Sequence, residues 1–283
     1  MTSAAHNRRR LAAQCAEWWL AAAVLAGCSP RAERLGWTVM GTVAAVQLRS
    51  GAKGAPASSY RDAAKSAFAE VEKLMNAHDP GSELSRLAAL ADDEIPAKCD
   101  ARMKPCYELA FKLMRESGGA FNPRWRGPET LDLGAIAKGF ALDFAAGSMH
   151  AVGDDVLLDL GGNLLSLPCG DGSARTWKTG VASADGGGIA AVVQLAPGEA
   201  LATSAEYYRG RHIYDGRTGR PADSGVASVT VLAKSAMLAD GLSTTLFVLG
   251  PEAGLAFIDR YGYKASVLFL MKDGRKIAND ARF

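Results

Sequence analysis

The chain has 283 residues, of which 48% are hydrophobic and 22% are charged, a composition typical of a globular protein long enough to bury its own core. Aromatic residues make up 7% of the sequence, which argues against a surface built to stack nucleic-acid bases. Of the 32 basic and 30 acidic residues, three arginines and one glutamate lie in residues 1–27, so the remainder has 29 of each and no net charge. Because no basic field remains, we expect no nucleic-acid partner.

The N-terminus has the features of an export signal. Three arginines, Arg8 to Arg10, precede a short apolar run over residues 18–27. This run is shorter than the roughly 20 apolar residues that cross a bilayer. We therefore predict a cleaved signal peptide over residues 1–27. The adjacent arginines also resemble a twin-arginine signal, which leaves the export route open.

The end of the apolar run, Leu25-Ala26-Gly27-Cys28, resembles the lipobox of bacterial lipoproteins. The resemblance implies that Cys28 is lipidated and that residues 28–36 form a tether. The mature protein would then be exported and held on a membrane through the lipid on Cys28, facing the periplasm. A plain secretory signal with a chance cysteine is the alternative.

Hydrophobic periodicity and turn residues predict the elements of the remaining chain. Helical spacing of apolar residues predicts helices over residues 62–76, from 82 onward, and over 105–117, 136–149, 235–249 and 252–261. Apolar and β-branched runs predict strands over residues 37–48, 156–160, 176–181, 189–195, 226–232 and 265–271. Because strands and helices do not alternate regularly, we expect an α+β fold. It forms a single globular domain over residues 37–283, with mixed, largely antiparallel sheets flanked by helices.

Three cysteines lie in this domain. Cys99 and Cys106 are close enough in sequence to form a disulfide in an oxidising compartment, although the sequence does not require it. Cys169 has no obvious partner and is expected to be a buried thiol.

The segment Asp132-Leu-Gly-Ala135-Ile-Ala-Lys138-Gly139 places small residues at the start of a predicted helix. Backbone N–H groups at such a turn suit an anion, and the Lys138 ammonium can add positive charge beside a phosphate. The spacing matches neither a Walker A loop nor a Rossmann glycine motif. A tightly packed helix start without a ligand is the alternative.

Asp240 and Thr244 stand four residues apart on one face of the predicted helix 235–249. A carboxylate and a hydroxyl that converge in this way can hold a hard cation such as Mg²⁺, which prefers oxygen ligands. By spacing alone, a solvated face with Thr244 bonded back to its own helix is the simpler interpretation.

His212 begins a short predicted strand that runs into a turn ending at Pro221. Histidine is the natural general base near neutral pH, whereas a surface hairpin without chemistry is the alternative. Two further glycine turns, over residues 118–123 and 159–163, carry no obvious general acid or base.

In their order along the chain, these motifs resemble the ApbE-type FAD:protein FMN transferase family. The similarity covers about residues 37–260. It rests on eight segments: Val39 to Thr42, Asp79 to Leu87, Gly119 to Pro123, Asp132 to Gly139, Leu160 to Asn163, Ala202 to Ser204, His212 to Pro221 and Ala239 to Gly250.

The resemblance implies a role for each matching position. The FAD site would be lined by Met40, His78, Ala120, Phe121, Asn122, Asp132 and Lys138. Mg²⁺ would be bound by the backbone carbonyl of Ala135 and the side chains of Asp240 and Thr244. His212 would act as the catalytic base, and Lys138 would stabilise the developing charge.

The implied reaction is the Mg²⁺-dependent transfer of FMN from FAD to a serine or threonine hydroxyl of another protein, with release of AMP. The implied partner is an acceptor protein with an exposed Ser/Thr loop, such as a membrane redox subunit. A Mg²⁺-dependent FAD pyrophosphatase and a non-catalytic periplasmic flavin-binding protein are the alternatives.

Two positions depart from the family pattern. His78 stands where the family often has a tyrosine near the flavin. Gly216 stands where the family usually has a proline, which predicts a looser turn after His212.

Overall fold

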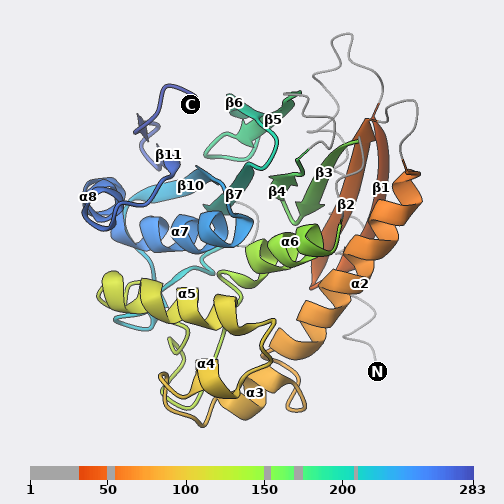
Figure 1. Ribbon diagram of the computed structural model, residues 1–283. Helices are drawn as coiled ribbons and strands as arrows, with labels where there is room; N and C mark the ends of the chain where they lie inside the picture. The colour runs from red at the N-terminus through yellow and green to blue at the C-terminus, as the bar shows by residue number, and fades with distance from the viewer. Residues whose placement is uncertain (1–31, 50–54, 150–153, 169–174, 207–209) are drawn as a thin grey trace, which may run out of the picture.

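An eight-stranded sheet forms the centre of this computed structural model (Figure 1). Its strands lie in the order β1 (Glu33–Val39), β2 (Thr42–Arg49), β3 (Asp155–Leu160), β4 (Asn163–Ser166), β7 (Ala200–Ala205), β10 (Val226–Ala233), β11 (Ser266–Met271) and β12 (Lys276–Ala278). Each of these neighbouring pairs is antiparallel. The expected α+β fold with largely antiparallel sheets is therefore confirmed.

The structure describes residues 32–49, 55–149, 154–168, 175–206 and 210–283. The predicted signal peptide, Cys28 and Cys169 lie outside these residues. Among the helices that the structure describes, none has the length and apolar character needed to cross a membrane.

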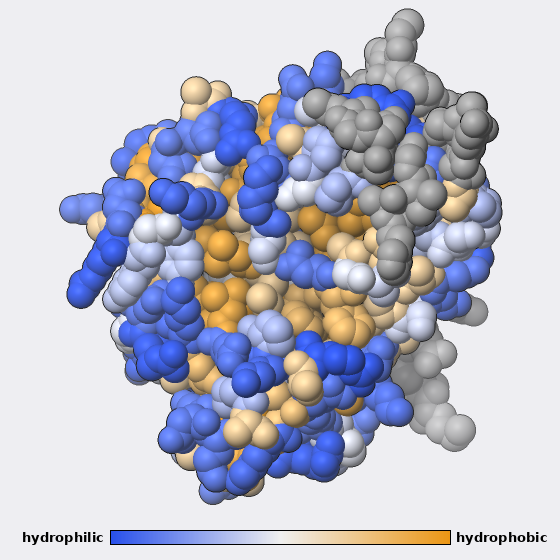
Figure 2. Space-filling model, in the orientation of Figure 1, coloured by the Kyte–Doolittle hydropathy of each residue, from blue (hydrophilic) through white to orange (hydrophobic). Residues whose placement is uncertain are grey.

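Helices cover one face of the sheet. The helices are α2 (Ala57–Met75), α3 (Glu83–Leu87), α4 (Ile95–Lys98), α5 (Lys104–Glu116), α6 (Ala137–Ser148), α7 (Ala236–Leu249) and α8 (Pro251–Tyr261). In Figure 1, α2, α6 and α7 lie in front of the sheet, and Figure 2 shows apolar side chains gathered at the centre of this same face. The main core lies between this layer and the sheet, where Phe68, Leu142 and Leu246 pack with Val46 and Val229.

A hairpin covers the opposite face of the sheet. It consists of β5 (Trp177–Ala182) and β6 (Ile189–Leu195). Trp177 and Val193 of the hairpin pack in a second cluster with Leu157, Leu164 and Leu201 of the sheet. Because both faces are covered, alternate residues of the central strands enter different cores.

The predicted strand over residues 37–48 is wrong, because this segment is a hairpin of β1 and β2. The turn falls at Met40 and Gly41, which have φ angles of 50° and 66°. Two-residue hairpin turns need such positive φ angles, and Met-Gly is a weaker sequence signal for them than Asn-Gly. Strand β1 begins at Glu33, four residues before the expected start of the domain.

Several short elements have no counterpart among the predicted ones. These are α4, β4, β7 and β12. The hairpin of β8 (Tyr214–Asp215) and β9 (Arg220–Pro221) was expected only as a short strand at His212 followed by a turn. Strand β7 reads Ala-Leu-Ala-Thr-Ser-Ala, which lacks an apolar alternation strong enough to identify it. Its place between β4 and β10 makes it a strand, because sheet pairing outweighs weak local preference.

Cys99 and Cys106 are free thiols in the structure. Burial raises the pKa of both thiols, and the nearby Glu83 carboxylate raises the pKa of Cys99 further. Both therefore stay protonated near neutral pH, and the disulfide that the sequence permits is not formed.

Candidate active site

Helices α6 and α7 approach each other closely where both begin. A Cβ atom on Gly139 would lie 2.2 Å from the backbone oxygen of Ala236 and 2.7 Å from Cβ of Asp240, so only glycine allows this approach. The Asp143 carboxylate of α6 accepts hydrogen bonds from the Ser235 hydroxyl at 2.6 Å and from the Ala236 N–H at 2.9 Å. These contacts fix the start of α7 against α6.

The junction brings Lys138 and Asp240 together from two separate motifs. Asp240 is 3% exposed, and its Oδ2 accepts a hydrogen bond from the Gly139 N–H at 2.9 Å. The Lys138 Nζ lies 3.4 Å from Oδ1 of Asp240. A buried carboxylate needs such compensation, because burial without a partner is costly.

Thr244 faces the same junction. Its Oγ1 lies 3.5 Å from the backbone oxygen of Ala135 and 3.1 Å from the Ser204 hydroxyl of β7. The hydroxyl that bonds back to its own helix is that of the next residue, Thr245, which donates to the Gly241 carbonyl at 2.8 Å. The simpler interpretation of a solvated helix face is therefore wrong for Asp240 and Thr244.

The donor groups at this junction fit a hard cation. The Asp240 carboxylate, the Thr244 hydroxyl and the Ala135 carbonyl are all oxygen donors, which is the ligand type that Mg²⁺ prefers. Throughout the described ranges there is no group of three or more His, Cys, Asp or Glu residues placed to hold a metal ion. These residues would hold such an ion, and waters or phosphate oxygens would supply its remaining ligands, as is common for Mg²⁺.

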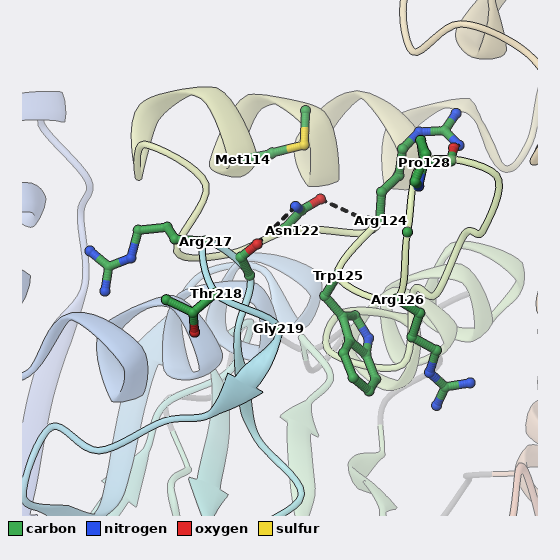
Figure 3. Close-up of a pocket in the computed structure, with 11 residues that line it drawn as sticks. Met114, Asn122, Arg124, Trp125, Arg126, Pro128, Arg217, Thr218 and Gly219 are labelled. Carbon is green, nitrogen blue, oxygen red and sulfur yellow. Dashed lines mark hydrogen bonds between the residues drawn. The ribbon is translucent and has the colours of Figure 1, made fainter.

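A second part of the candidate site joins the Ala120-Phe121-Asn122 segment to the turn after His212. The Asn122 Nδ2 donates to the Gly216 carbonyl at 3.2 Å (Figure 3). The Gly216 N–H donates to the Ala120 carbonyl at 3.1 Å. A Cβ atom on Gly216 would lie 2.3 Å from Cβ of Asn122. The predicted looser turn is therefore wrong, since Gly216 is tightly packed and its N–H is used. Proline would lose that hydrogen bond.

His212 is exposed and stands just before this turn. Its Nδ1 lies 2.8 Å from the Gly210 carbonyl oxygen. Because a carbonyl oxygen can only accept, Nδ1 is the donor in this contact, which leaves Nε2 as the ring nitrogen available to a substrate. Among the described residues, no hydrogen bond or ion pair joins His212 to Lys138, Asp240 or Thr244.

Met40 and His78 lie near the end of α2. The Met40 N–H donates to Oε1 of Glu72 at 3.0 Å, and Met40 is the one non-glycine residue with positive φ in the described part of the chain. Such strained positions often occur at functional sites. His78 is exposed, and its N–H donates to Asn76 at 2.9 Å. No described hydrogen bond links either residue to the α6–α7 junction.

The sequence model of the ApbE family matches residues 40–127 and 126–269. The chain belongs to the ApbE family. All the site residues predicted from the sequence, from Met40 to Thr244, lie within the matched ranges.

Curated relatives of this ApbE-family chain are named FAD:protein FMN transferase. One from Rhodobacter capsulatus is 40% identical over 153 residues, 51% of this chain and 28% of that protein. One from Vibrio cholerae is 34% identical over 52% of this chain and 46% of that protein. One from Treponema pallidum is 27% identical and covers 84% of each chain.

Solved ApbE structures share the fold. The flavin transferase ApbE from Vibrio cholerae has a TM-score of 0.72 at 24% identity, over 89% of this chain and 99% of that one. The apo flavinyl transferase ApbE of Pseudomonas stutzeri has a TM-score of 0.70 at 24% identity, over 89% and 95% of the two chains.

Sequence reasoning missed the residues that hold Asp132 in this ApbE-family chain. The Trp125 indole N–H donates to Oδ2 of Asp132 at 3.3 Å, and the Arg126 guanidinium lies 3.3 Å from the same oxygen. Trp125 also stacks on Tyr214 of β8, with ring centroids 4.1 Å apart. Trp125 and Arg126 border a groove of about 570 Å³ (Figure 3). No local sequence signal connects Trp125 with Tyr214, because their contact depends on the hydrogen-bonded Asn122 and Gly216.

Ser204 was also missed as a site residue, although its Ala-Thr-Ser segment belongs to the family motifs. The Ser204 hydroxyl lies 2.8 Å from the Ser243 hydroxyl and 3.1 Å from that of Thr244. It therefore orients Thr244 from the sheet. The contact between Ser204 and Thr244 could be recognised only once residues 200–205 were known to form strand β7.

Proposed function

We propose that this protein is a Mg²⁺-dependent FAD:protein FMN transferase, which moves FMN from FAD to a serine or threonine hydroxyl of an acceptor protein. The observation that carries the proposal is the convergence of Lys138 with the oxygen donors of Ala135, Asp240 and Thr244 at one helix junction. Relatives of this chain are named for the same reaction. A cation site beside a lysine is suited to a pyrophosphate.

In the proposed reaction, the acceptor oxygen forms a bond to the FMN phosphorus while the phosphorus–oxygen bond to AMP breaks. The hydroxyl proton passes to Nε2 of His212, and AMP leaves with the electrons of the broken bond. Lys138 stabilises the charge that develops on the phosphate oxygens. When bound, Mg²⁺ would neutralise part of the negative charge of the pyrophosphate.

The FAD site in this proposal is formed by Met40, His78, the segment Ala120 to Asn122, Asp132 and Lys138. Support comes from the contacts that hold Asp132 in place. Its Oδ1 accepts a hydrogen bond from the Gly134 N–H, and its Oδ2 accepts one from the Trp125 indole and pairs with the Arg126 guanidinium. The exposure of His212 supports a protein as acceptor, because a side chain on a protruding loop can reach it. We propose a membrane redox subunit as that partner.

The test is a mass measurement. The protein is incubated with FAD, Mg²⁺ and a serine- or threonine-containing acceptor peptide, and we expect a covalent FMN adduct on the peptide together with free AMP. Chelation of Mg²⁺ should abolish both products. FMN and AMP without an adduct would instead identify a pyrophosphatase, which the exposed His212 would also serve with water as acceptor. Intact FAD in the presence of Mg²⁺ would identify a flavin-binding protein.

We further propose that residues 1–27 are removed on export and that Cys28 is lipidated, so that the domain faces the periplasm. The interval from Cys28 to the start of β1 at Glu33 spans at most about 18 Å when fully extended. A lipid on Cys28 would therefore keep the site near a membrane-bound acceptor. Cys28→Ser should move the protein from the membrane fraction to the soluble fraction, and an unchanged membrane fraction would contradict lipid anchoring.

A further inference from the structure

The side-chain amide of Asn163 is buried in β4, the strand that pairs with β7 of the candidate site. Asn163 is 2% exposed, and its Nδ2 has no hydrogen-bond partner within the described part of the chain. Buried polar side chains are nearly always paired in folded proteins, because an unpaired donor loses its hydration without compensation. Asn163 belongs to the Gly-Gly-Asn segment, to which the proposed reaction assigns no role.

The position of Asn163 in β4 directs its side chain toward the helix layer. Successive side chains of a strand point to opposite faces. Leu164 packs in the cluster under the β5–β6 hairpin, whereas Leu165 packs in the main core. Asn163 shares the face of Leu165, on which β4 contacts α6 and α7.

Strand pairing places Asn163 on β4, beside strand β7, which carries Ser204. Leu164 pairs with Leu201 of β7, so one step further in this antiparallel register Asn163 lies beside Ala202. Ala202 precedes Ser204 by two residues on the same face, and the Ser204 hydroxyl lies 3.1 Å from that of Thr244. The amide thus lies on the strand next to the one whose Ser204 contacts the predicted ligand Thr244.

The other neighbour of Asn163 is the turn that carries Met40. A Cβ atom on Gly161 would lie 2.8 Å from Oγ1 of Thr42, so the β3–β4 turn packs directly on the start of β2. Met40 lies in the β1–β2 turn, two residues before Thr42, and has the strained positive φ. Asn163 therefore lies between a predicted FAD contact and the α6–α7 junction.

We propose that the side-chain amide of Asn163 donates a hydrogen bond to an oxygen of bound FAD beside the metal site. The inference rests on the proposed function, because FAD is its ligand. An N–H group pairs with a phosphate or hydroxyl oxygen and cannot ligate a cation, which assigns Nδ2 to the dinucleotide and not to Mg²⁺. FAD binding then pairs a donor that has no partner among the residues the structure describes.

The experiment measures the Kd of the full-length protein for FAD, by quenching of flavin fluorescence in the presence of Mg²⁺. Asn163→Leu has a similar volume and no donor, and we expect it to raise the Kd about tenfold, the effect of one lost hydrogen bond. The thermal midpoint of the FAD-free variant should stay equal or rise, because the unpaired donor is gone. A purely structural role predicts the reverse: a lower midpoint and an unchanged Kd.

Two further variants sharpen the test. Asn163→Asp keeps the shape but replaces the donor with a carboxylate, and it should weaken FAD binding at least as much as Asn163→Leu. Ser228→Ala is the matched control, because the Ser228 hydroxyl is also fully buried and unpaired within the described residues. Ser228 shares the face of Leu232, which packs under the β5–β6 hairpin, so its loss should leave the Kd for FAD unchanged.

A Kd within twofold of the unmodified protein in both Asn163 variants would overturn the role of Asn163 while leaving the proposed function intact. Tighter Mg²⁺ binding by Asn163→Asp with retained FAD affinity would also overturn it, since the residue would then be a metal ligand. Failure of the unmodified protein to bind FAD would overturn the proposed function and this inference together.

Discussion

The Lys138 ammonium lies 3.4 Å and 3.5 Å from the two carboxylate oxygens of Asp240, so one lysine covers both oxygens of the predicted metal ligand. The Asp240 side chain is 4% exposed and that of Lys138 is 25% exposed. The lysine supplies the positive charge that the buried carboxylate needs. A cation at the same carboxylate would compete with Lys138 and free it for a phosphate.

Lys138→Gln should therefore strengthen Mg²⁺ binding but slow the transfer of FMN from FAD. We expect tighter Mg²⁺ binding in the absence of FAD, because the competing ammonium is removed. Transfer should fall by about 10²–10³-fold in kcat/KM, the usual effect of losing one group that stabilises transition-state charge. Calorimetry with Mg²⁺ and steady-state kinetics measure the two effects. Lys65→Gln, on the exposed side of α2, is the control and should change neither.

Thr244→Val should weaken Mg²⁺ binding while preserving the fold. The substitution keeps the shape and removes the hydroxyl that lies 3.5 Å from the Ala135 carbonyl. A shift of the Mg²⁺ dependence of transfer to higher concentration is the expected result. Thr245→Val is the matched control, because its hydroxyl bonds only to the Gly241 carbonyl in the described structure. If both variants show the same Mg²⁺ dependence, Thr244 is not a ligand.

Gly139→Ala should destabilise the protein, because its Cβ would lie 2.2 Å from the Ala236 carbonyl oxygen. Overpacking of this kind lowers the free energy of unfolding by about 1–3 kcal/mol. The control is Gly147→Ala in the same helix, where the added Cβ would meet no atom within 4 Å beyond its chain neighbours and its own helix backbone. That change should raise the free energy of unfolding by about 0.5–1 kcal/mol through helix propensity. Urea unfolding of both variants checks the contrast, and equal stabilities would contradict the close approach of α6 and α7.

Trp125→Ala should raise the KM for FAD with a smaller change in kcat. The substitution removes both the hydrogen bond to Asp132 and the stack on Tyr214. Trp125→Phe keeps an aromatic ring but no N–H donor, and it should give an intermediate KM. Steady-state kinetics at varied FAD concentration separate the two contributions. An unchanged KM in Trp125→Ala would mean that Asp132 does not need this support.

The local sequence predicted most of the long elements because their signals are local. Helix α7 was expected over residues 235–249 and runs over Ala236–Leu249, and its start is marked by the Ser235 cap, which accepts from the Leu238 N–H at 3.1 Å. Strand β6 was expected over 189–195 and occupies those residues. Strand β7 was missed because its small and polar residues become a strand only through their neighbours in the sheet.

The sequence by itself determined the family and the fold class, and it predicted the chemical types of the candidate site residues. Asp240 and Thr244 could be paired from the sequence, because a spacing of four places them on one face of a helix. Their partners Lys138 and Ser204 lie 102 and 40 residues away along the chain, respectively. Only the tertiary structure decided that Lys138 covers Asp240, that Trp125 holds Asp132 and that the Asn163 amide has no partner among the described residues. Contacts across such distances depend on how helices and strands pack, and no local pattern of residues encodes that packing.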